Sequence, residues 1–268
     1  FVRYDKRGHG LSEATPAPYS IDDHVGDLES LLDHLGVKAC AVIGLSVGGV
    51  IAQGLAARRP DLVKVMVLMD TAHKIGTAEM WNQRIDGVTA NGIASLADAI
   101  MQRWFTPAYR SPDNPDFVGY TAMLTRTTVD GYAGTCAALR DTDYTEQTRA
   151  LSLPVLAIVG DQDGSTPPDL VRSTADLIRG AQFRIIADAG HLPCIEQPRA
   201  VANLVSNFLR ETRFATSVAP SRALGRPTTR RVARVSDASS VSDPDQDRHS
   251  GVYSMSQYVS VRREGDIA

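Results

Sequence analysis

The most constraining feature of this sequence is the pentapeptide Gly-Leu-Ser-Val-Gly at residues 44–48. An uncharged apolar run at 39–43 precedes it and predicts a buried strand, and the residues after it continue as an apolar helical pattern. A strand that turns directly into a helix leaves little room, so glycine is needed on both sides of Ser46. The pattern G-x-S-x-G in this context predicts an exposed serine hydroxyl, with the backbone N–H of Val47 as an oxyanion donor.

Two other interpretations of the same stretch are weaker. A dinucleotide-binding G-x-G-x-x-G loop requires glycine at position 46, where this chain has serine, and no Gly-Lys-Ser/Thr sequence indicates a P-loop. Residues 39–57 carry no charge, and Gly44 and Gly48 form a GxxxG spacing typical of membrane helices. The closely spaced glycines nevertheless favour a tight turn in a soluble core over one continuous helix.

Strand and helix patterns alternate around this turn. Residues 20–35 open on a capping box, Ser-Ile-Asp-Asp, and continue with valine and leucine at helical spacing. Apolar runs that predict further strands lie at 63–69, 154–159 and 183–186. This alternation predicts an α/β fold with a mostly parallel sheet and with ligand chemistry at the carboxyl ends of the strands.

The alternation stops between residues 71 and 150, where the patterns are helical and no convincing strand occurs. We expect this segment to be an inserted helical cap that covers a pocket and excludes water from it. Residues 1–70 and 151–212 would then form the core. From residue 213 to residue 268 the sequence is rich in Arg and Ser without periodicity, which predicts a disordered tail.

A serine hydroxyl needs a base to become a nucleophile, and a histidine base needs a carboxylate to orient it. His191 is the candidate base because it follows the last predicted strand in the turn Ala-Gly-His-Leu-Pro. Asp163 is the candidate acid because it follows the strand before that, which gives the chain order Ser46, Asp163, His191. Asp70, at the end of an earlier strand, is the main rival, and Asp161 is an alternative that also suits a turn.

The charge balance excludes broad classes of partner. Lys and Arg total 28 against 31 Asp and Glu, a net charge of −3, so no positive field is available to attract nucleic acid or an anionic membrane. The three cysteines are widely spaced and odd in number, which suits a reducing compartment better than a disulfide framework. We therefore expect a cytoplasmic protein that acts on a small molecule, and the sequence indicates no particular oligomeric state.

Several segments make residues 1 to about 212 similar to the α/β-hydrolase superfamily. Residues 4–12, Tyr-Asp-Lys-Arg-Gly-His-Gly-Leu-Ser, resemble its strand-and-turn signature upstream of the serine. Residues 189–191, Ala-Gly-His, together with Glu-Gln-Pro at 196–198, resemble its histidine loop. Within the predicted cap, three segments resemble the 3-oxoadipate enol-lactonase family more specifically, namely residues 71–77, 103–107 and 139–143.

The resemblance implies hydrolysis of 3-oxoadipate enol-lactone to 3-oxoadipate, a step of aromatic-compound catabolism in the β-ketoadipate pathway. It implies Ser46 as nucleophile, His191 as base and Asp163 as the acid that aligns it, with no metal and no organic cofactor. The substrate carries a free carboxylate, so the cap should present a cation to it. The candidates are Arg84, Arg103, Arg126 and Arg140, and Trp81 and Trp104 are candidate pocket-wall residues.

The superfamily pattern also includes N-terminal strands and a His-Gly loop that supplies a second oxyanion donor, and neither is found in residues 1–268. We expect the protein to begin upstream of Phe1, and we expect a gap in this sheet between strands at 2–4 and 39–43. Losing one oxyanion donor typically lowers the rate by about 10²–10³. Two alternatives stay open: another hydrolase of this superfamily, such as an esterase or a carbon–carbon bond hydrolase, and a non-catalytic fragment that only binds.

Overall fold

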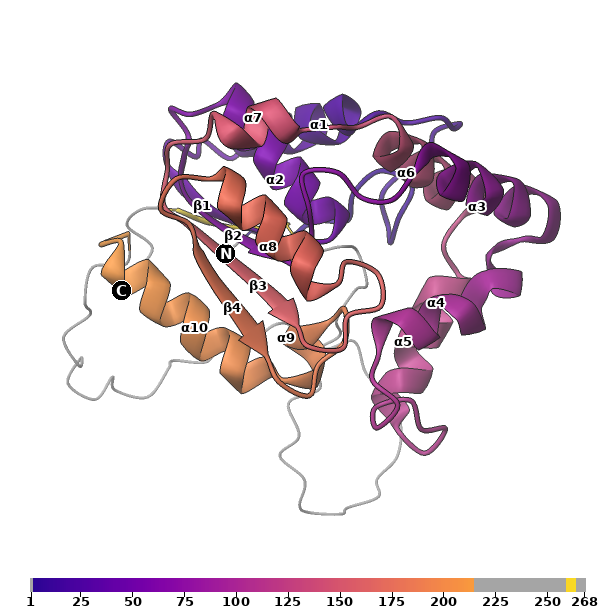
Figure 1. Cartoon of the computed structure of the whole chain (residues 1–268). Helices are drawn as coiled ribbons and strands as arrows, with labels where there is room; N and C mark the ends of the chain where they lie inside the picture. The colour runs from indigo at the N-terminus through magenta and orange to yellow at the C-terminus, as the bar shows by residue number, and fades with distance from the viewer. Residues whose placement is uncertain (1, 215–258, 264–268) are drawn as a thin grey trace, which may run out of the picture.

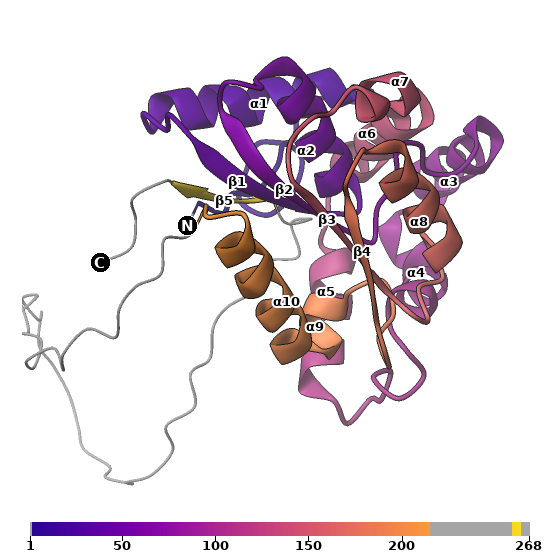
Figure 2. The same ribbon diagram turned by 60° about the vertical axis from the view of Figure 1, so that its left-hand side comes forward.

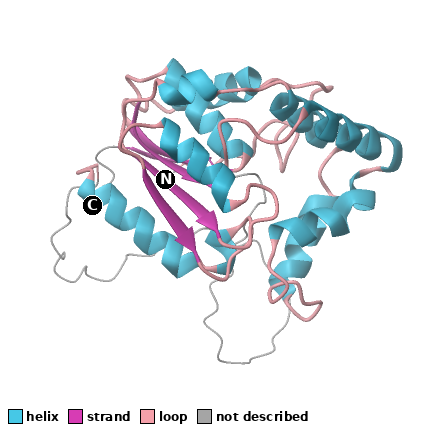
Figure 3. Ribbon diagram, viewed as in Figure 1, coloured by secondary structure: helices cyan, strands magenta, loops and turns pink. Residues whose placement is uncertain are grey.

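The computed structural model describes residues 2–214 and 259–263, and its centre is a five-stranded sheet (Figure 1 and Figure 3). The strand order is β4-β3-β2-β1-β5. The strands are β1 (Cys40–Leu45), β2 (Val63–Met69), β3 (Val155–Gly160), β4 (Gln182–Ile186) and β5 (Val259–Arg263). Strands β1 to β4 pair in parallel, and β5 pairs antiparallel with β1. The strands predicted at 39–43, 63–69, 154–159 and 183–186 are confirmed, each within two residues of its expected bounds.

Helices cover both faces of the sheet (Figure 2). Helices α1 (Ile21–His34), α2 (Val47–Arg58) and α8 (Pro168–Leu177) lie on one face, and α9 (Pro193–Glu196) and α10 (Pro198–Glu211) lie on the other. Alternate residues of β3 therefore enter different hydrophobic clusters. Ala157 and Val159 pack with residues of α8, whereas Leu156 and Ile158 pack with residues of α10. Burial on both faces explains why the central strands are continuous apolar runs in the sequence.

Helix α1 begins at the capping box that the sequence predicts. The hydroxyl of Ser20 accepts a hydrogen bond from the backbone N–H of Asp23 (3.1 Å), and the Asp23 carboxylate accepts one from the backbone N–H of Ser20 (2.8 Å). Val25, Leu28 and Leu32 are completely buried against the sheet. The amphipathic helix expected at 20–35 is confirmed.

Between β2 and β3 the chain is helical, with no strand at residues 70–154. The helices are α3 (Ala78–Asn91), the 3₁₀ helix η1 (Ile93–Leu96), α4 (Ala97–Trp104), α5 (Pro115–Thr125), α6 (Val129–Arg140) and α7 (Thr145–Arg149). Helices α3, α4 and α5 lie beyond the carboxyl ends of the parallel strands (Figure 1). Helix α7 packs against α2 and α8, so the last part of the segment expected to form the cap packs on the core instead.

The edge of the sheet next to β1 differs from the expectation. Residues 259–263 belong to the tail predicted to be disordered, yet they form β5 and occupy the edge where we expected a gap. An open edge of β1 would leave backbone N–H and C=O groups unpaired, and β5 satisfies them. The strand expected at residues 2–4 is reduced to a single bridge at Val2. The rest of the predicted tail, 215–258 and 264–268, lies outside the described residues.

The uncharged stretch at 39–57 is not one helix. It is divided between β1 and α2, with Ser46 at the turn between them. In the part of the chain that the structure describes, no helix is both long enough and apolar enough to cross a membrane. The tight-turn interpretation of the glycines therefore agrees with the structure.

Candidate active site

Ser46 occupies the turn between β1 and α2 in a strained backbone conformation. Its φ of 54° and ψ of −122° lie outside the regions that residues with a side chain ordinarily adopt. The Ser46 N–H donates to the carbonyl of Met69 (2.9 Å), and the Ser46 carbonyl accepts from the Thr71 hydroxyl (2.6 Å). Both partners lie at the end of β2, so the neighbouring strand fixes the turn. Ser46 is thereby held at the carboxyl end of the sheet.

The glycine at position 44 is required by a close approach of two backbone segments. A Cβ atom there would lie 2.2 Å from the carbonyl oxygen of Gly48, in the first turn of α2. A Cβ atom at Gly49 would lie 2.4 Å from the side chain of Thr71. The spacing of glycines in the sequence therefore reflects how closely the helix follows the strand.

We expect Gly44→Ala to lower the free energy of unfolding by at least about 2 kcal/mol, because the strand or the helix must move to admit the methyl group. Denaturant unfolding measures the change. Gly119→Ala in α5 is the matched control, since a Cβ atom there meets no atom within 4 Å. Alanine is the better helix former, so this control should be neutral or stabilising. Equal stability of the two variants would contradict the account of the turn.

Asp163 and His191 form a buried pair. Asp163 follows β3 and His191 follows β4, so both reach the edge of the sheet at which Ser46 lies. Nδ1 of His191 lies 2.9 Å from Oδ2 of Asp163, and both side chains are almost completely buried. The structure brings together the acid and the base that the sequence predicts.

The surroundings of Asp163 favour its charged form. Oδ1 accepts hydrogen bonds from the backbone N–H groups of Ser165 (2.7 Å) and Thr166 (3.0 Å), and Oδ2 accepts one from the Thr166 hydroxyl (2.7 Å). Burial alone would raise the pKa of Asp163, but the charge of His191 and these hydrogen bonds outweigh it and lower the pKa below its ordinary value. An ionised Asp163 can only accept at Nδ1 of His191, which leaves Nε2 as the proton acceptor.

The loop that carries His191 is anchored to the end of α4 and the residues that follow it. The His191 N–H donates to the carbonyl of Trp104 (2.9 Å), and the two rings stack with centroids 6.3 Å apart. Glu196 in α9 accepts hydrogen bonds from the Gly190 N–H (2.6 Å) and from the N–H and hydroxyl of Thr106 (3.0 and 2.6 Å). Beyond its place in the Glu-Gln-Pro segment, no role is predicted for Glu196, because a partner 90 residues away leaves no local signal in the sequence.

Ser46 and His191 line the same cavity. Its walls combine apolar side chains of the cap with a few polar groups, as small-molecule sites commonly do. Apolar groups come from Ile75, Met80, Leu124 and Leu139, and polar groups from His9, Tyr132, Thr135 and Thr166. The geometry can hold a small ligand against a serine, a histidine and the positive end of α2.

Four of the predicted pocket residues line this cavity, namely Trp81, Arg84, Arg103 and Trp104. For Arg126 and Arg140 the structure corrects the prediction. Arg140 lies outside the cavity lining, where its guanidinium pairs with the Asp141 carboxylate (2.7 Å) and donates to the Asn82 side chain (2.9 Å). Arg126 is an exposed residue at the end of α5. Neither side chain lines the cavity.

Arg84 is held against the buried indole of Trp81. The guanidinium carbon lies 5.3 Å from the ring centroid, and the indole N–H donates to the carbonyl of Ile75 (2.6 Å). Tyr132 lies next to Arg84, and burial raises the pKa of its phenol to about 12, so the phenol stays neutral. The Arg84 guanidinium, held on the Trp81 ring beside the neutral Tyr132 hydroxyl, is well placed to bind an anionic group of a ligand.

The rival acids have other partners. Asp70 is completely buried, and its Oδ1 accepts a hydrogen bond from the Gly160 N–H (2.9 Å). Asp161 accepts one from the Ala189 N–H (3.1 Å) and so joins the turns after β3 and β4. Among the described residues, Asp163 is the carboxylate at hydrogen-bond distance from His191.

The sequence of this chain is similar to sequences of known α/β hydrolases. The sequence model of a family described as alpha/beta hydrolase fold matches residues 1–198. The chain is similar to 3-oxoadipate enol-lactonase 2 of Acinetobacter baylyi, with 34% identity over 210 residues that cover 78% of this chain and 78% of that enzyme.

The fold of this chain is also similar to solved structures of hydrolases. An enol-lactonase from Burkholderia xenovorans LB400 superimposes with a TM-score of 0.75 at 35% identity, over 77% of this chain and 79% of that chain. A thermophilic esterase from Thermogutta terrifontis superimposes with a TM-score of 0.72 at 28% identity, over 78% of each chain. The scaffold is therefore shared with enzymes that differ in substrate.

Proposed function

This chain belongs to the α/β-hydrolase fold family, and we propose from that premise that it is a serine hydrolase that opens 3-oxoadipate enol-lactone to 3-oxoadipate. The observation that carries the proposal is the buried pair of Asp163 and His191 beside the cavity that Ser46 also lines. The likeness to enol-lactonases of Acinetobacter baylyi and Burkholderia xenovorans supports the choice of substrate.

In the proposed reaction, the hydroxyl of Ser46 gives its proton to Nε2 of His191 as its oxygen attacks the lactone carbonyl carbon. The carbonyl oxygen becomes an oxyanion, which the N–H of Val47 stabilises at the positive end of α2. Collapse of this intermediate breaks the ring C–O bond, and the protonated His191 gives its proton to the leaving enolate, which ketonises. His191 then takes a proton from water as the water attacks the acyl-enzyme, and it returns that proton to Ser46 as the acyl bond breaks and 3-oxoadipate is released. Asp163 keeps the imidazole aligned and balances its positive charge.

Arg84 is our choice for the group that binds the free carboxylate of the substrate, because it is half-buried and fixed on Trp81. Arg103 also lines the cavity but is exposed. A hydrogen bond to a charged group contributes about 1.5–3 kcal/mol, so Arg84→Gln should raise KM for the lactone about tenfold to a hundredfold. Steady-state kinetics at several lactone concentrations measure this, with a smaller rise expected for Arg103→Gln.

Arg140→Gln is the matched control for the carboxylate site. Its guanidinium pairs with Asp141 and does not line the cavity, so the KM for the lactone should stay close to that of the wild type. A KM that is unchanged in Arg84→Gln, or that rises equally in Arg140→Gln, would remove Arg84 from this role.

The competing proposal is an esterase, which the likeness to the Thermogutta terrifontis enzyme favours. Comparison of kcat/KM for 3-oxoadipate enol-lactone with that for 4-nitrophenyl acetate separates the two. A lactonase should prefer the lactone by at least about tenfold to a hundredfold, the range over which pocket contacts discriminate. Preference for the aryl ester would favour the esterase, and binding of the lactone without turnover of either compound would favour a binding protein.

We further propose that the protein acts in the cytoplasm, in aromatic-compound catabolism through the β-ketoadipate pathway. The support for the compartment is that Cys40, Cys136 and Cys194 are all free thiols. The support for the pathway is the chemistry of the proposed substrate alone.

A further inference from the structure

A second carboxyl group lies behind the candidate acid and has no role in the mechanism above. Asp70 follows β2 in a left-handed backbone conformation, with φ of 46°, and its side chain is completely buried. Oδ1 accepts one hydrogen bond, from the Gly160 N–H, while no N–H or O–H donor among the described residues reaches Oδ2, and the side chain that raises the pKa of Asp70 through a shared hydrogen bond is the Asp163 carboxyl. A buried oxygen that no such donor reaches is costly and calls for an explanation.

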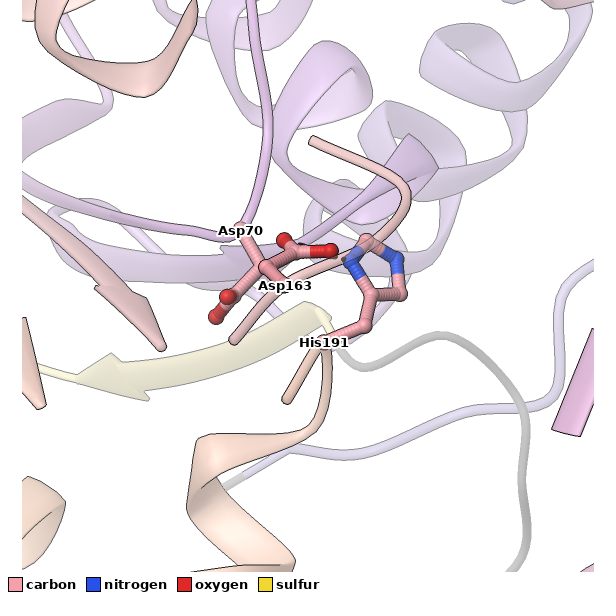
Figure 4. A group of neighbouring side chains, drawn as sticks. All are labelled: Asp70, Asp163 and His191. Atoms are coloured by element: carbon pink, nitrogen blue, oxygen red, sulfur yellow. Dashed lines mark hydrogen bonds and ion pairs between the residues drawn. The ribbon is translucent and has the colours of Figure 1, made fainter. Parts of the chain in front are cut away.

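The two carboxyl groups are too close for both to be charged at low cost. Ligand atoms of Asp70, Asp163 and His191 all lie within 4.8 Å of one another, and Figure 4 shows both carboxyl groups on the same side of the imidazole ring. Asp163 accepts three hydrogen bonds from Ser165 and Thr166 in addition to facing His191, whereas Asp70 accepts one. Like charges in a buried site disfavour double ionisation, so the proton belongs on the carboxyl group with fewer donors, Asp70.

The other groups around Asp70 supply no positive charge to offset a second negative one. Glu196 is a further carboxylate nearby, and Cys194, also in α9, has a thiol whose pKa burial raises to about 12. Burial, followed by the charge of Asp163, raises the pKa of Asp70 well above its ordinary value, against the opposing effect of the Gly160 N–H. His191 is the group of this cluster that becomes positive in the proposed reaction, and it is already paired with Asp163.

We propose that Asp70 and Asp163 form an acid–carboxylate pair in which Asp70 keeps its proton at neutral pH and Asp163 carries the single negative charge behind His191. This inference rests on the proposed function, because it assumes that His191 acts as the base. One charge matches the one positive charge that His191 acquires in the reaction, whereas two would make the imidazole hold its proton too firmly to act as a base. Asp70 is thus a positioning residue that sets the charge of the pair.

Two consequences distinguish this role from a merely structural one. First, Asp70→Asn replaces one neutral group with another of the same shape, so it should leave the pH dependence of the reaction unchanged. Second, Asp163→Asn removes the charge that, after burial, does most to keep Asp70 protonated. Asp70 can then ionise and partly replace the lost carboxylate, so Asp163→Asn should be more active than the double variant Asp70→Asn/Asp163→Asn.

The first test does not require activity and uses thermal unfolding of the wild type and Asp70→Asn from pH 5 to pH 8. In the unfolded chain a carboxyl of ordinary pKa, 3.8, ionises below this range, while the folded wild type keeps the proton. The stability that the protonated Asp70 contributes is present below pH 3.8 and is lost as the pH rises toward the folded pKa. Asp70→Asn lacks this loss, so its advantage in Tm should be at least about 2–4 °C larger at pH 7.5 than at pH 5.

The exposed Asp176, in the last turn of α8, supplies the matched control as Asp176→Asn, whose difference in Tm from the wild type should not change over this range. A constant difference for Asp70→Asn as well would overturn the proposal. If Asp70→Asn does not fold, infrared spectroscopy of the wild type at pH 7 decides, because a buried protonated carboxyl shows its own C=O stretching band. Absence of that band would equally overturn the proposal.

The second test measures kcat/KM for the enol-lactone as a function of pH. We expect the acidic limb of Asp70→Asn to keep the midpoint of the wild type, and the double variant to be at least tenfold less active than Asp163→Asn. A midpoint shifted to lower pH by a unit or more would mean that Asp70 is charged in the wild type, and equal activity of the two Asp163 variants would mean that Asp70 does not reach His191. If neither the wild type nor any variant hydrolyses the lactone, the proposed function is wrong. The unfolding test still decides whether Asp70 is protonated.

Discussion

Ser46→Ala is expected to lower kcat for 3-oxoadipate enol-lactone by at least about 10⁴-fold, since loss of the nucleophile removes the covalent route and leaves only binding and oxyanion stabilisation. The KM should change little, because the hydroxyl contributes mainly to the transition state. The change is small in volume and removes no hydrogen bond that holds the turn, since Met69 and Thr71 bind the backbone of Ser46. Single-turnover measurements of lactone consumption give the rate directly.

Ser173→Ala serves as the control for Ser46→Ala. Ser173 is exposed on α8, and its hydroxyl donates to the carbonyl of Leu170 within the same helix. The activity of Ser173→Ala should match that of the wild type. Lactone hydrolysis that persists in Ser46→Ala at a tenth of the wild-type rate or more would exclude acyl transfer through this residue.

His191→Gln should have an effect of similar size, a loss of about 10⁴–10⁶-fold in kcat, because the serine hydroxyl then has no base and the leaving enolate has no acid. Glutamine can still donate an amide N–H toward Asp163, so the buried carboxylate keeps a partner and the fold should survive. The loss should not be recovered at any pH between 6 and 9, since the amide does not titrate. A rate–pH profile together with near-UV circular dichroism checks both points.

His34→Gln is the matched control for His191→Gln, because His34 is an exposed residue in the last turn of α1. It should leave the rate and its pH profile unchanged. If His191→Gln retained a bell-shaped profile of ordinary height, a different base would have to be found.

The sequence predicts the serine turn well because close packing of strand and helix restricts it locally. Glycine at position 44 follows from the collision that a side chain there would make with the backbone of Gly48, a residue only four positions away. The pairing of Asp163 with His191 is predictable for a related reason: in a parallel sheet the residue after each strand reaches the same edge, so chain order alone points to these two residues as the candidate acid and base.

Contacts between distant residues explain what the sequence could not predict. Glu196 ties the histidine loop to Thr106 across 90 residues, and neither residue shows this in its local pattern. The choice among the arginines depends on which face of a helix meets the cavity, and Arg140 failed as a candidate because Asp141 and Asn82 hold it elsewhere. Strand β5 was missed because a short segment within an Arg- and Ser-rich stretch gains strand structure only by pairing with β1.

The sequence predicts the position of Asp70 near the candidate site, but not its charge. The sequence placed a second carboxyl group at the end of β2, and the structure locates it beside Asp163 and within 4.8 Å of the same histidine. Which of the two carries charge depends on the donors around each group, and three of those come from residues 165 and 166 in the turn after β3. The order of residue types in the sequence does not indicate how many hydrogen-bond donors surround each carboxyl group.

The central claim, that Ser46 is a nucleophile activated by His191 and aligned by Asp163, is tested most directly by treating the protein with a fluorophosphonate and locating the adduct by peptide mass spectrometry. We predict a single adduct on Ser46 that forms within minutes in the wild type and at least about 10³-fold more slowly in His191→Gln. An unmodified Ser46 in the folded protein, or labelling of Ser46 at the same rate without His191, would contradict the claim.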